Sequence, residues 1–185
     1  MSLRHAILGF LALKPMSGYD LRKTFDASVG YFWPADQAQI YRTLAKLVDD
    51  GLVTVATEEQ AARPNRRIHT IHPAGLAALD AWLAEPVASA PAREPFLLKL
   101  FLGGRLGAEA MQALLEARVA EMAEMIASLE AIETATLAAK PEGLEAQLRL
   151  ATLENGLAHA RTEQDWALTL AGTLTSPRSP EADHG

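Results

Sequence analysis

The chain has 185 residues, a formal net charge of -6, no cysteine and 49% hydrophobic residues. This length fits one large domain or two small ones, and the apolar fraction excludes a largely disordered chain. The absence of cysteine excludes a disulfide scaffold, a thiolate nucleophile and metal sites with sulfur ligands. No apolar run reaches the roughly 18 residues of a membrane span, and the run 6–13 lacks a cleavage site. We therefore expect a cytoplasmic protein without a membrane partner.

Two helices are predicted at the start of the chain. Ser2 is placed to cap the first, which Pro15 ends. Ser17, followed three residues later by Asp20, predicts the start of a second helix that ends at Gly30. The apolar face of this second helix is formed by Tyr19, Leu21 and Phe25. After it, Phe32 and Trp33 are expected to pack in the core.

A third helix is predicted to begin at the capping pattern Asp36–Gln39 and to end before Gly51. Ile40, Leu44 and Leu47 recur at helical spacing, which predicts a buried face. The other face is polar or basic and consists of Gln37, Gln39, Arg42, Thr43 and Lys46. This polar face is either a simple solvated surface or a surface that contacts a ligand.

A hairpin and a fourth helix follow. Residues 52–57 and 66–72 are predicted strands, and Pro73 is suited to the first position of a helix. Three helices, a hairpin and a helix within residues 1–84 are typical of a winged helix-turn-helix, whose third helix lies in the major groove of DNA. The hairpin loop, the wing, holds the densest basic cluster of the chain, formed by Arg63, Asn65, Arg66 and Arg67. Such a cluster neutralises phosphates, although Arg66 and Arg67 alternate along a strand, so that only one is expected to face DNA.

Several segments, in this order and spacing, resemble the PadR family of transcriptional regulators. They are ILG at 7–9, SGYDL at 17–21, FW at 32–33, QIY at 39–41 and RRIHT at 66–70, where His69 replaces the tyrosine usual in the family. EPFLLKLF at 94–101 and the helix 153–166 resemble the long C-terminal domain of the members with a large second domain.

The resemblance implies a dimeric repressor that binds an inverted repeat in double-stranded DNA. It also implies a small-molecule effector, often an aromatic acid, that releases the repressor. By position, the resemblance assigns Gln37, Gln39 and Tyr41 to the DNA-contacting helix, and Arg66 and Arg67 to the basic wing. The complete set of predicted DNA-contacting residues is Tyr19, Gln37, Gln39, Tyr41, Arg42, Lys46, Arg63, Asn65, Arg66 and Arg67.

The second half of the chain is predicted to be a helical dimerisation arm. Residues 107–140 contain no Gly or Pro after Gly107 and are rich in strong helix formers, and a final helix follows residue 143. An isolated pair of such helices has a thin core, so we expect it to pack against a second chain. The predicted dimerisation residues are Leu115, Val119, Met122, Ile126, Leu129, Leu153, Leu157 and Trp166, the first five of which form a heptad seam.

Charge and proline content predict the domain boundaries. Residues 1–84 hold nine basic and eight acidic residues, whereas residues 85–185 hold eight basic and fifteen acidic ones. Three prolines lie within residues 85–95. We therefore predict a winged helix-turn-helix domain at 1–84, a proline-rich linker at 85–95, a helical dimerisation and effector domain at 96–174 and a disordered tail at 175–185. An effector is expected to bind where the two domains join and to change the spacing of the two recognition helices.

Other function classes have less support. The sequence contains no phosphate loop, no nucleophile-elbow motif and no paired-histidine metal motif, so no catalytic residues, no metal site and no cofactor are predicted. His69 and His72 are three residues apart on a predicted strand and would point to opposite faces. The alternative function is a winged-helix module that binds a protein partner and carries a helical dimerisation arm.

Overall fold

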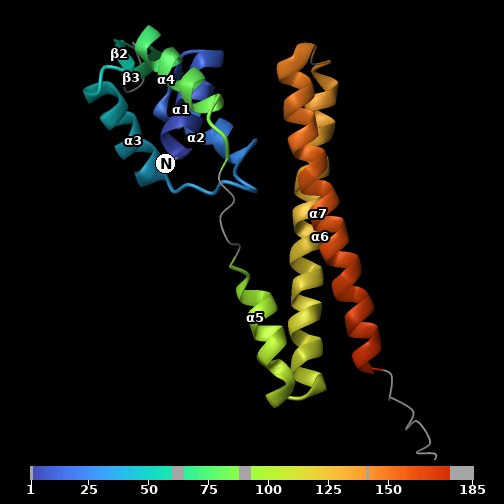
Figure 1. Cartoon of the computed structure of the whole chain (residues 1–185). Helices are drawn as coiled ribbons and strands as arrows, with labels where there is room; N and C mark the ends of the chain where they lie inside the picture. Colours follow the sequence, from blue (N-terminus) through green and yellow to red (C-terminus); the bar gives the residue numbers. More distant parts are fainter. Residues whose placement is uncertain (1, 60–64, 88–92, 141, 176–185) are drawn as a thin grey trace, which may run out of the picture. The chain divides into compact units, whose positions relative to one another are not determined.

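A computed structural model describes residues 2–59, 65–87, 93–140 and 142–175. The chain divides into two compact units, Met1–Ser89 and Ala90–Gly185, and the division falls inside the proline-rich segment 85–95. The predicted fold class is confirmed: the structure is mostly helical, with a winged helix-turn-helix followed by long helices (Figure 1). The elements of the first unit are α1 (Ser2–Leu13), β1 (Met16–Ser17), α2 (Gly18–Asp26), α3 (Gln37–Asp49), β2 (Val53–Glu58), β3 (Arg66–Ile71) and α4 (Pro73–Leu83).

The core of the first unit joins the apolar faces of its four helices to the sheet. Each apolar side chain buried in this way contributes roughly 1.5–3 kcal/mol relative to an exposed one, which fixes the helices against one another. Ile40, Leu44 and Leu47 are buried, as their spacing predicts, so α3 is held by one face and presents the other to solvent. The buried cluster consists of Ile7, Leu8, Leu11, Met16, Leu21, Phe25, Ile40, Leu44, Leu47, Val53 and Leu79.

The sheet has three antiparallel strands in the order β1–β3–β2. The predicted hairpin is present, and its register runs from Val53 opposite Ile71 to Glu58 opposite Arg66. The two-residue strand β1 is not predicted from the sequence, because a segment this short has no periodicity of its own. It pairs with β3 through Met16 opposite His69 and Ser17 opposite Ile68, and this pairing places the start of α2 beside the wing strand.

The segment between α2 and α3 differs from the sequence prediction. Helix α2 ends at Asp26 rather than at Gly30, and turns follow it as far as Trp33. Phe32 is 51% exposed and Trp33 is 40% exposed, so the expectation that this pair lies in the core is wrong. Tyr19 is also at the surface, with 67% exposure. The reason is the length of α2, whose nine residues bury only one short face, formed by Gly18, Leu21 and Phe25.

The second unit contains α5 (Pro95–Leu102), a short 3-10 helix η1 (Gly103–Arg105), α6 (Ala108–Ala138) and α7 (Gly143–Thr175). At 1.5 Å per residue, the 31 residues of α6 extend over about 46 Å. Since α6 and α7 are consecutive and lie side by side, they form an antiparallel hairpin (Figure 1). Among the described residues, none of the helices combines the length and apolar composition needed to cross a membrane.

The predicted heptad seam holds the two helices of one chain together. Leu115, Met122 and Leu129 of α6 are buried, as are Leu153 and Leu157 of α7, and each is at most 7% exposed within the single chain. These five side chains therefore leave almost no surface for a second chain. A seam between α6 and α7 buries the same heptad positions as a seam between two chains, so the pattern alone does not distinguish them.

Candidate nucleic-acid interface

Helix α3 is capped at both ends and exposes one of its faces. The predicted capping box is present: the Asp36 carboxylate accepts a hydrogen bond from the Gln39 backbone N–H at 2.7 Å, and the Gln39 side chain accepts from the Asp36 N–H at 3.4 Å. At the other end, Gly51 has a φ of 69°, a left-handed conformation that favours glycine. The capping box and the glycine therefore determine where helix α3, and with it the exposed face, begins and ends.

The predicted contact residues on α3 are all exposed, but they differ in how they are held. Gln37 accepts a hydrogen bond from Arg22 at 2.7 Å, and Lys46 pairs with Asp50 at 3.4 Å. Arg42 makes no hydrogen bond or ion pair with another described residue. It lies in the middle of the exposed face, between the small side chains of Ala38 and Ala45. Its guanidinium is therefore available to an external partner.

Tyr41 lies against the first turn of α2. A Cβ atom added to Gly18 would lie 2.7 Å from Cε1 of Tyr41, which is closer than real Cβ contacts. Gly18 thus permits the tyrosine ring to approach the backbone of α2. Tyr19, the next residue, projects into solvent. The two tyrosines therefore lie on the same side of the helix-turn-helix, where both line one groove.

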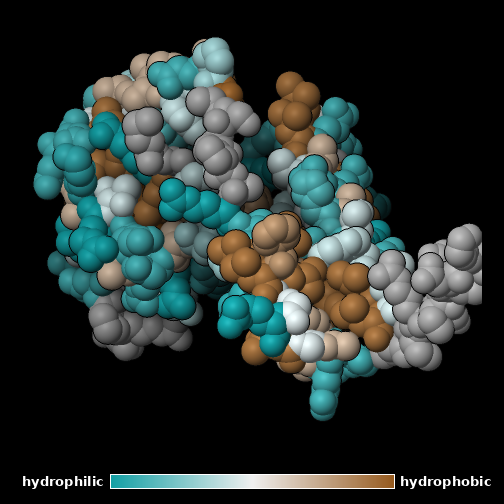
Figure 2. All heavy atoms as spheres, turned by 60° about the horizontal axis from the view of Figure 1, so that its bottom comes forward, coloured by the Kyte–Doolittle hydropathy of each residue, from teal (hydrophilic) through white to brown (hydrophobic). Residues whose placement is uncertain are grey.

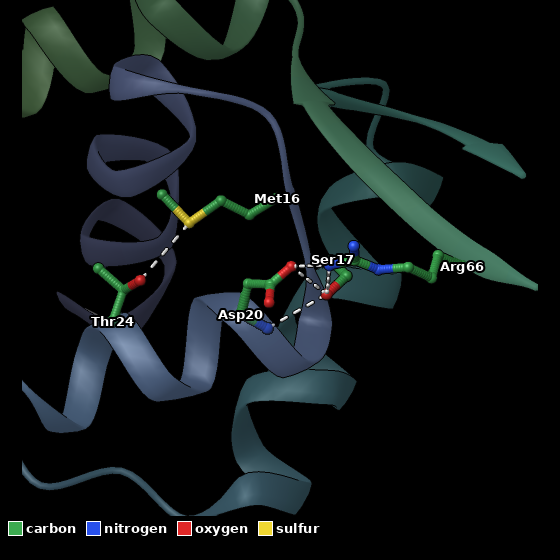
Figure 3. A network of polar contacts seen from close by, with 5 residues as sticks. All are labelled: Met16, Ser17, Asp20, Thr24 and Arg66. Atoms are coloured by element: carbon green, nitrogen blue, oxygen red, sulfur yellow. Dashed lines mark hydrogen bonds and ion pairs between the residues drawn. The ribbon is translucent and has the colours of Figure 1, made fainter. Parts of the chain in front are cut away.

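A polar network ties the wing strand to α2 (Figure 3). The Ser17 hydroxyl accepts a hydrogen bond from the Asp20 backbone N–H at 3.2 Å and donates one to the Asp20 carboxylate at 2.7 Å. Arg66 of β3 forms an ion pair with the same carboxylate. The Ser17 hydroxyl lowers the pKa of Asp20 below its ordinary value, and the positive charge of Arg66 lowers it further.

The two wing arginines have different environments. Arg66 points toward α2 and is engaged by Asp20, whereas Arg67 is exposed and makes no hydrogen bond or ion pair with another described residue. The predicted alternation along the strand is thus present, and of the two arginines Arg67 is the one without a hydrogen-bond or ion-pair partner among the described residues. Asn65 is exposed at the start of the strand. Arg63 lies outside the described residues.

These residues surround a groove of about 840 Å³ between α2, α3 and β3, which we call the wing-side groove. Tyr19, Tyr41, Asn65 and both wing arginines line it. It brings together predicted contact residues from three segments that are far apart in the sequence. Asp20 and Asp49 also line it, so its described charges are two basic and two acidic side chains.

The histidines of this unit are structural. His69 is 8% exposed, and burial lowers its pKa below the ordinary value, which favours the neutral ring. The ring of His5 stacks on Trp82 at 4.6 Å between centroids. His72 caps α4, with its Nδ1 accepting a hydrogen bond from the Ala74 N–H at 3.2 Å. Within the described part of the chain, no group of three or more His, Asp or Glu side chains is arranged to hold a metal ion.

The other predicted dimerisation residues lie nearer the surface of the second unit. Val119 and Ile126 are partly exposed, and Trp166 is 39% exposed. The indole of Trp166 meets Phe96 of α5 edge-on, at 6.1 Å between centroids. Arg118 of α6 lies over the same Phe96 ring at 5.0 Å and pairs with Glu163 of α7 at 3.1 Å. This cluster fixes the start of α5 on the α6–α7 hairpin.

The sequence reasoning missed several residues of the site. The sequence predicts Asp20 only as part of a helix start, although its carboxylate also pairs with Arg66, 46 residues away. Arg4 of α1 forms an ion pair with Asp50 at the end of α3, and the sequence does not predict it. No local pattern connects these partners, because each pair comes together only when the helices pack.

Comparison with known proteins shows that two protein families match this chain, one in each half. A transcriptional regulator PadR-like family matches residues 7–81, and a family described as virulence activator alpha C-term matches residues 92–175. The probable transcriptional regulator Rv1176c of Mycobacterium tuberculosis is 33% identical over 190 residues, covering 96% of this chain and 100% of the relative. The negative transcriptional regulator PadR of Bacillus subtilis is 31% identical over 134 residues, covering 69% of this chain and 73% of that protein.

Solved structures resemble the chain over nearly its whole length. Bacillus subtilis PadR in complex with operator DNA superposes with a TM-score of 0.82 at 24% identity, covering 94% of this chain and 99% of that one. The same protein in complex with p-coumaric acid gives 0.75 at 23% identity, covering 95% and 96%. The virulence activator AphA of Vibrio cholerae gives 0.75 at 33% identity, covering 94% and 98%.

Proposed function

Because the chain belongs to the PadR-like family of transcriptional regulators, we propose that it is a repressor that binds an inverted-repeat operator as a homodimer. The effector that releases it is a small aromatic acid. These finer points are supported by similar proteins that include a negative transcriptional regulator, a structure in complex with operator DNA and a structure in complex with p-coumaric acid. Another similar structure is that of a virulence activator, so activation is the alternative to repression.

The observation that carries the proposal is the exposed face of α3. The opposite face of α3 packs in the core, a capping box closes its first turn, and Arg42 at the centre of the exposed face has no hydrogen-bond or ion-pair partner among the described residues. An arginine presented in this way from a recognition helix donates two hydrogen bonds to guanine, which is the commonest specific contact in the major groove. The wing-side groove supplies Tyr19, Arg67 and Asn65 for the phosphate backbone.

A homodimer is proposed for two reasons. One recognition helix reads too few base pairs for high specificity, whereas two helices about 34 Å apart read both halves of a palindrome. In addition, the helical unit exposes large apolar side chains along α5 and just after it, which a second copy of the chain would cover. Figure 2 shows apolar side chains gathered at this end of the unit. They are Leu97, Leu98, Phe101, Leu102 and Leu106.

This apolar face replaces the heptad seam as the proposed dimer contact. Phe101 is 86% exposed, so replacing it with glutamate removes little of the packing that stabilises the single chain. We expect Phe101→Glu to convert the dimer into a monomer in sedimentation velocity experiments. Leu148→Glu, which changes an equally apolar exposed residue on α7, serves as the control and is expected to leave the mass unchanged. A dimer that survives Phe101→Glu would place the contact elsewhere.

Fluorescence anisotropy tests the function itself. The purified protein is titrated onto a labelled duplex from its own promoter region and onto random duplex, across a salt series. Tight binding to the promoter that outcompetes random DNA, with a linear dependence of log affinity on log salt, is expected. Equal and weak binding to both, followed by failure of a random-site selection, would favour the alternative winged-helix module that binds a protein. The same assay then measures release by p-coumaric acid and related aromatic acids.

A further inference from the structure

Helix α3 has a second groove along its other flank. This groove, of about 640 Å³, lies between α3, the first turns of α1 and the middle of α4, and we call it the α1-side groove. Arg4 contributes from α1, and Gln39, Arg42 and Lys46 contribute from α3. The recognition helix therefore lies between two grooves. The wing-side groove contains Tyr19, Asn65 and Arg67, which are proposed above as contacts to the phosphate backbone.

The two grooves differ in charge. The described residues that line the wing-side groove include two aspartates that balance its two arginines. Those that line the α1-side groove include Arg4, Arg42 and Lys46 and no carboxylate. Two of these cations share one described carboxylate, that of Asp50, which accepts a hydrogen bond from Arg4 at 3.0 Å and pairs with Lys46 at 3.4 Å. The single negative charge of Asp50 cannot neutralise the positive charges of both Arg4 and Lys46. The described side chains of the α1-side groove therefore carry a net positive charge.

We propose that the α1-side groove binds the phosphate backbone on the side of α3 away from the wing, with Arg4 as a DNA contact. The proposal rests on the proposed function. The major groove of B-DNA is about 12 Å wide and has a phosphate backbone along each side, so a helix lying in it meets phosphates on both flanks. Arg4 uses one nitrogen for Asp50, and its remaining N–H donors can reach a phosphate oxygen.

The salt dependence of binding tests this contact. The slope of log affinity against log salt is negative, and each phosphate contact adds about 0.9 to its magnitude. A dimer has two copies of Arg4, so Arg4→Ala should reduce the magnitude of the slope by about 1.8. Between 50 and 200 mM salt, the wild type should then lose about 12-fold more affinity than the variant. The loss should be equal on operator and random duplex, because phosphates carry no sequence information. Arg4→Lys should keep the slope.

Two further variants separate a phosphate contact from a structural role. If Arg4 acts only by holding Asp50, then Asp50→Asn should weaken DNA binding as Arg4→Ala does. If Arg4 contacts phosphate, Asp50→Asn should retain or strengthen binding, because it removes a negative charge beside two cations. Lys14→Ala, which removes an exposed charge just after the other end of α1, is the matched control and should keep the wild-type slope.

The outcomes distinguish this inference from the proposed function. An unchanged slope for Arg4→Ala, or a loss with Asp50→Asn that matches the loss with Arg4→Ala, overturns the role of the α1-side groove. A wild-type protein that does not prefer operator over random duplex overturns the proposed function, whereas the slope comparison is still made on random DNA. Thermal unfolding of each variant confirms that the compared proteins are folded.

Discussion

The Asp20–Arg66 ion pair gives a prediction about how firmly the wing is held to α2. In Asp20→Asn, the side chain can still accept from Ser17, but the charge that attracts Arg66 is lost. Both side chains of the pair are 41% exposed, so solvent screens the interaction and its value is that of a surface pair, about 0.2–1 kcal/mol. We expect the free energy of unfolding to fall by an amount in this range at pH 7.

The pH dependence of this loss has a definite sign. The pKa of Asp20 is lowered in the folded chain from an ordinary value of 3.8. A lowered carboxylate pKa contributes stability that is fully present above the unfolded value and is lost as the pH falls through the folded one. The difference between wild type and Asp20→Asn should therefore be constant from pH 7 to about pH 5 and should shrink below about pH 4.

Urea unfolding followed by tryptophan fluorescence measures this difference at each pH. Asp26→Asn is the matched control, because Asp26 lies on the same helix and its ion pair among the described residues is with Arg22, four residues earlier, at 3.5 Å. It is expected to change stability less than Asp20→Asn does. Equal stability of wild type and Asp20→Asn at pH 7, or a difference that grows on acidification, would refute the reasoning.

The remaining predictions concern α3 and its supports. Arg42→Ala should leave the unfolding midpoint unchanged, because Arg42 has no partner among the described residues, and should reduce operator affinity by about 1–3 kcal/mol per half-site with a smaller effect on random duplex, in competition anisotropy. Gly18→Ala should displace the ring of Tyr41 and weaken DNA binding. A shift of the tyrosine fluorescence or of the Tyr41 NMR signals would report the displacement, and unchanged Tyr41 signals would contradict it. Asp36→Ala removes the cap of α3 and should cost about 1 kcal/mol in chemical denaturation, whereas no loss would mean that the capping box adds nothing to stability.

Much of the first unit could be predicted from the sequence, because its signals are local. The capping pattern Asp36–Gln39, the cap at Ser17 and the proline at position 73 each mark a helix start at the residue where the structure has it. The two capping signals depend on hydrogen bonds between residues three apart, which form whenever the helix forms, and the proline signal depends on its fixed φ. The buried face of α3 was predicted for a related reason, since helical spacing alone determines which residues share a face.

The burial of Phe32 and Trp33 was predicted wrongly, because apolar character does not determine whether the core has room for a side chain. The core of the first unit is completed by residues from α1, α2, α3, α4 and the sheet, and the turn after α2 ends outside it. The ion pairs Arg66–Asp20 and Arg4–Asp50 likewise cannot be predicted from the sequence. Each pair joins residues 46 positions apart, and only the packing of helices on the sheet brings them together.

The helices of the second unit show the same division between local and tertiary information. Helix formers without an internal glycine or proline predict by themselves one long helix within residues 107–140, and the structure has it at Ala108–Ala138. The heptad spacing by itself determines that Leu115, Met122 and Leu129 share a face that must be covered. The spacing does not say what covers that face, because a helix of the same chain and a helix of a second chain bury it equally well. Only the tertiary structure decided that α7 does so, through a connection short enough to fold the chain back on itself.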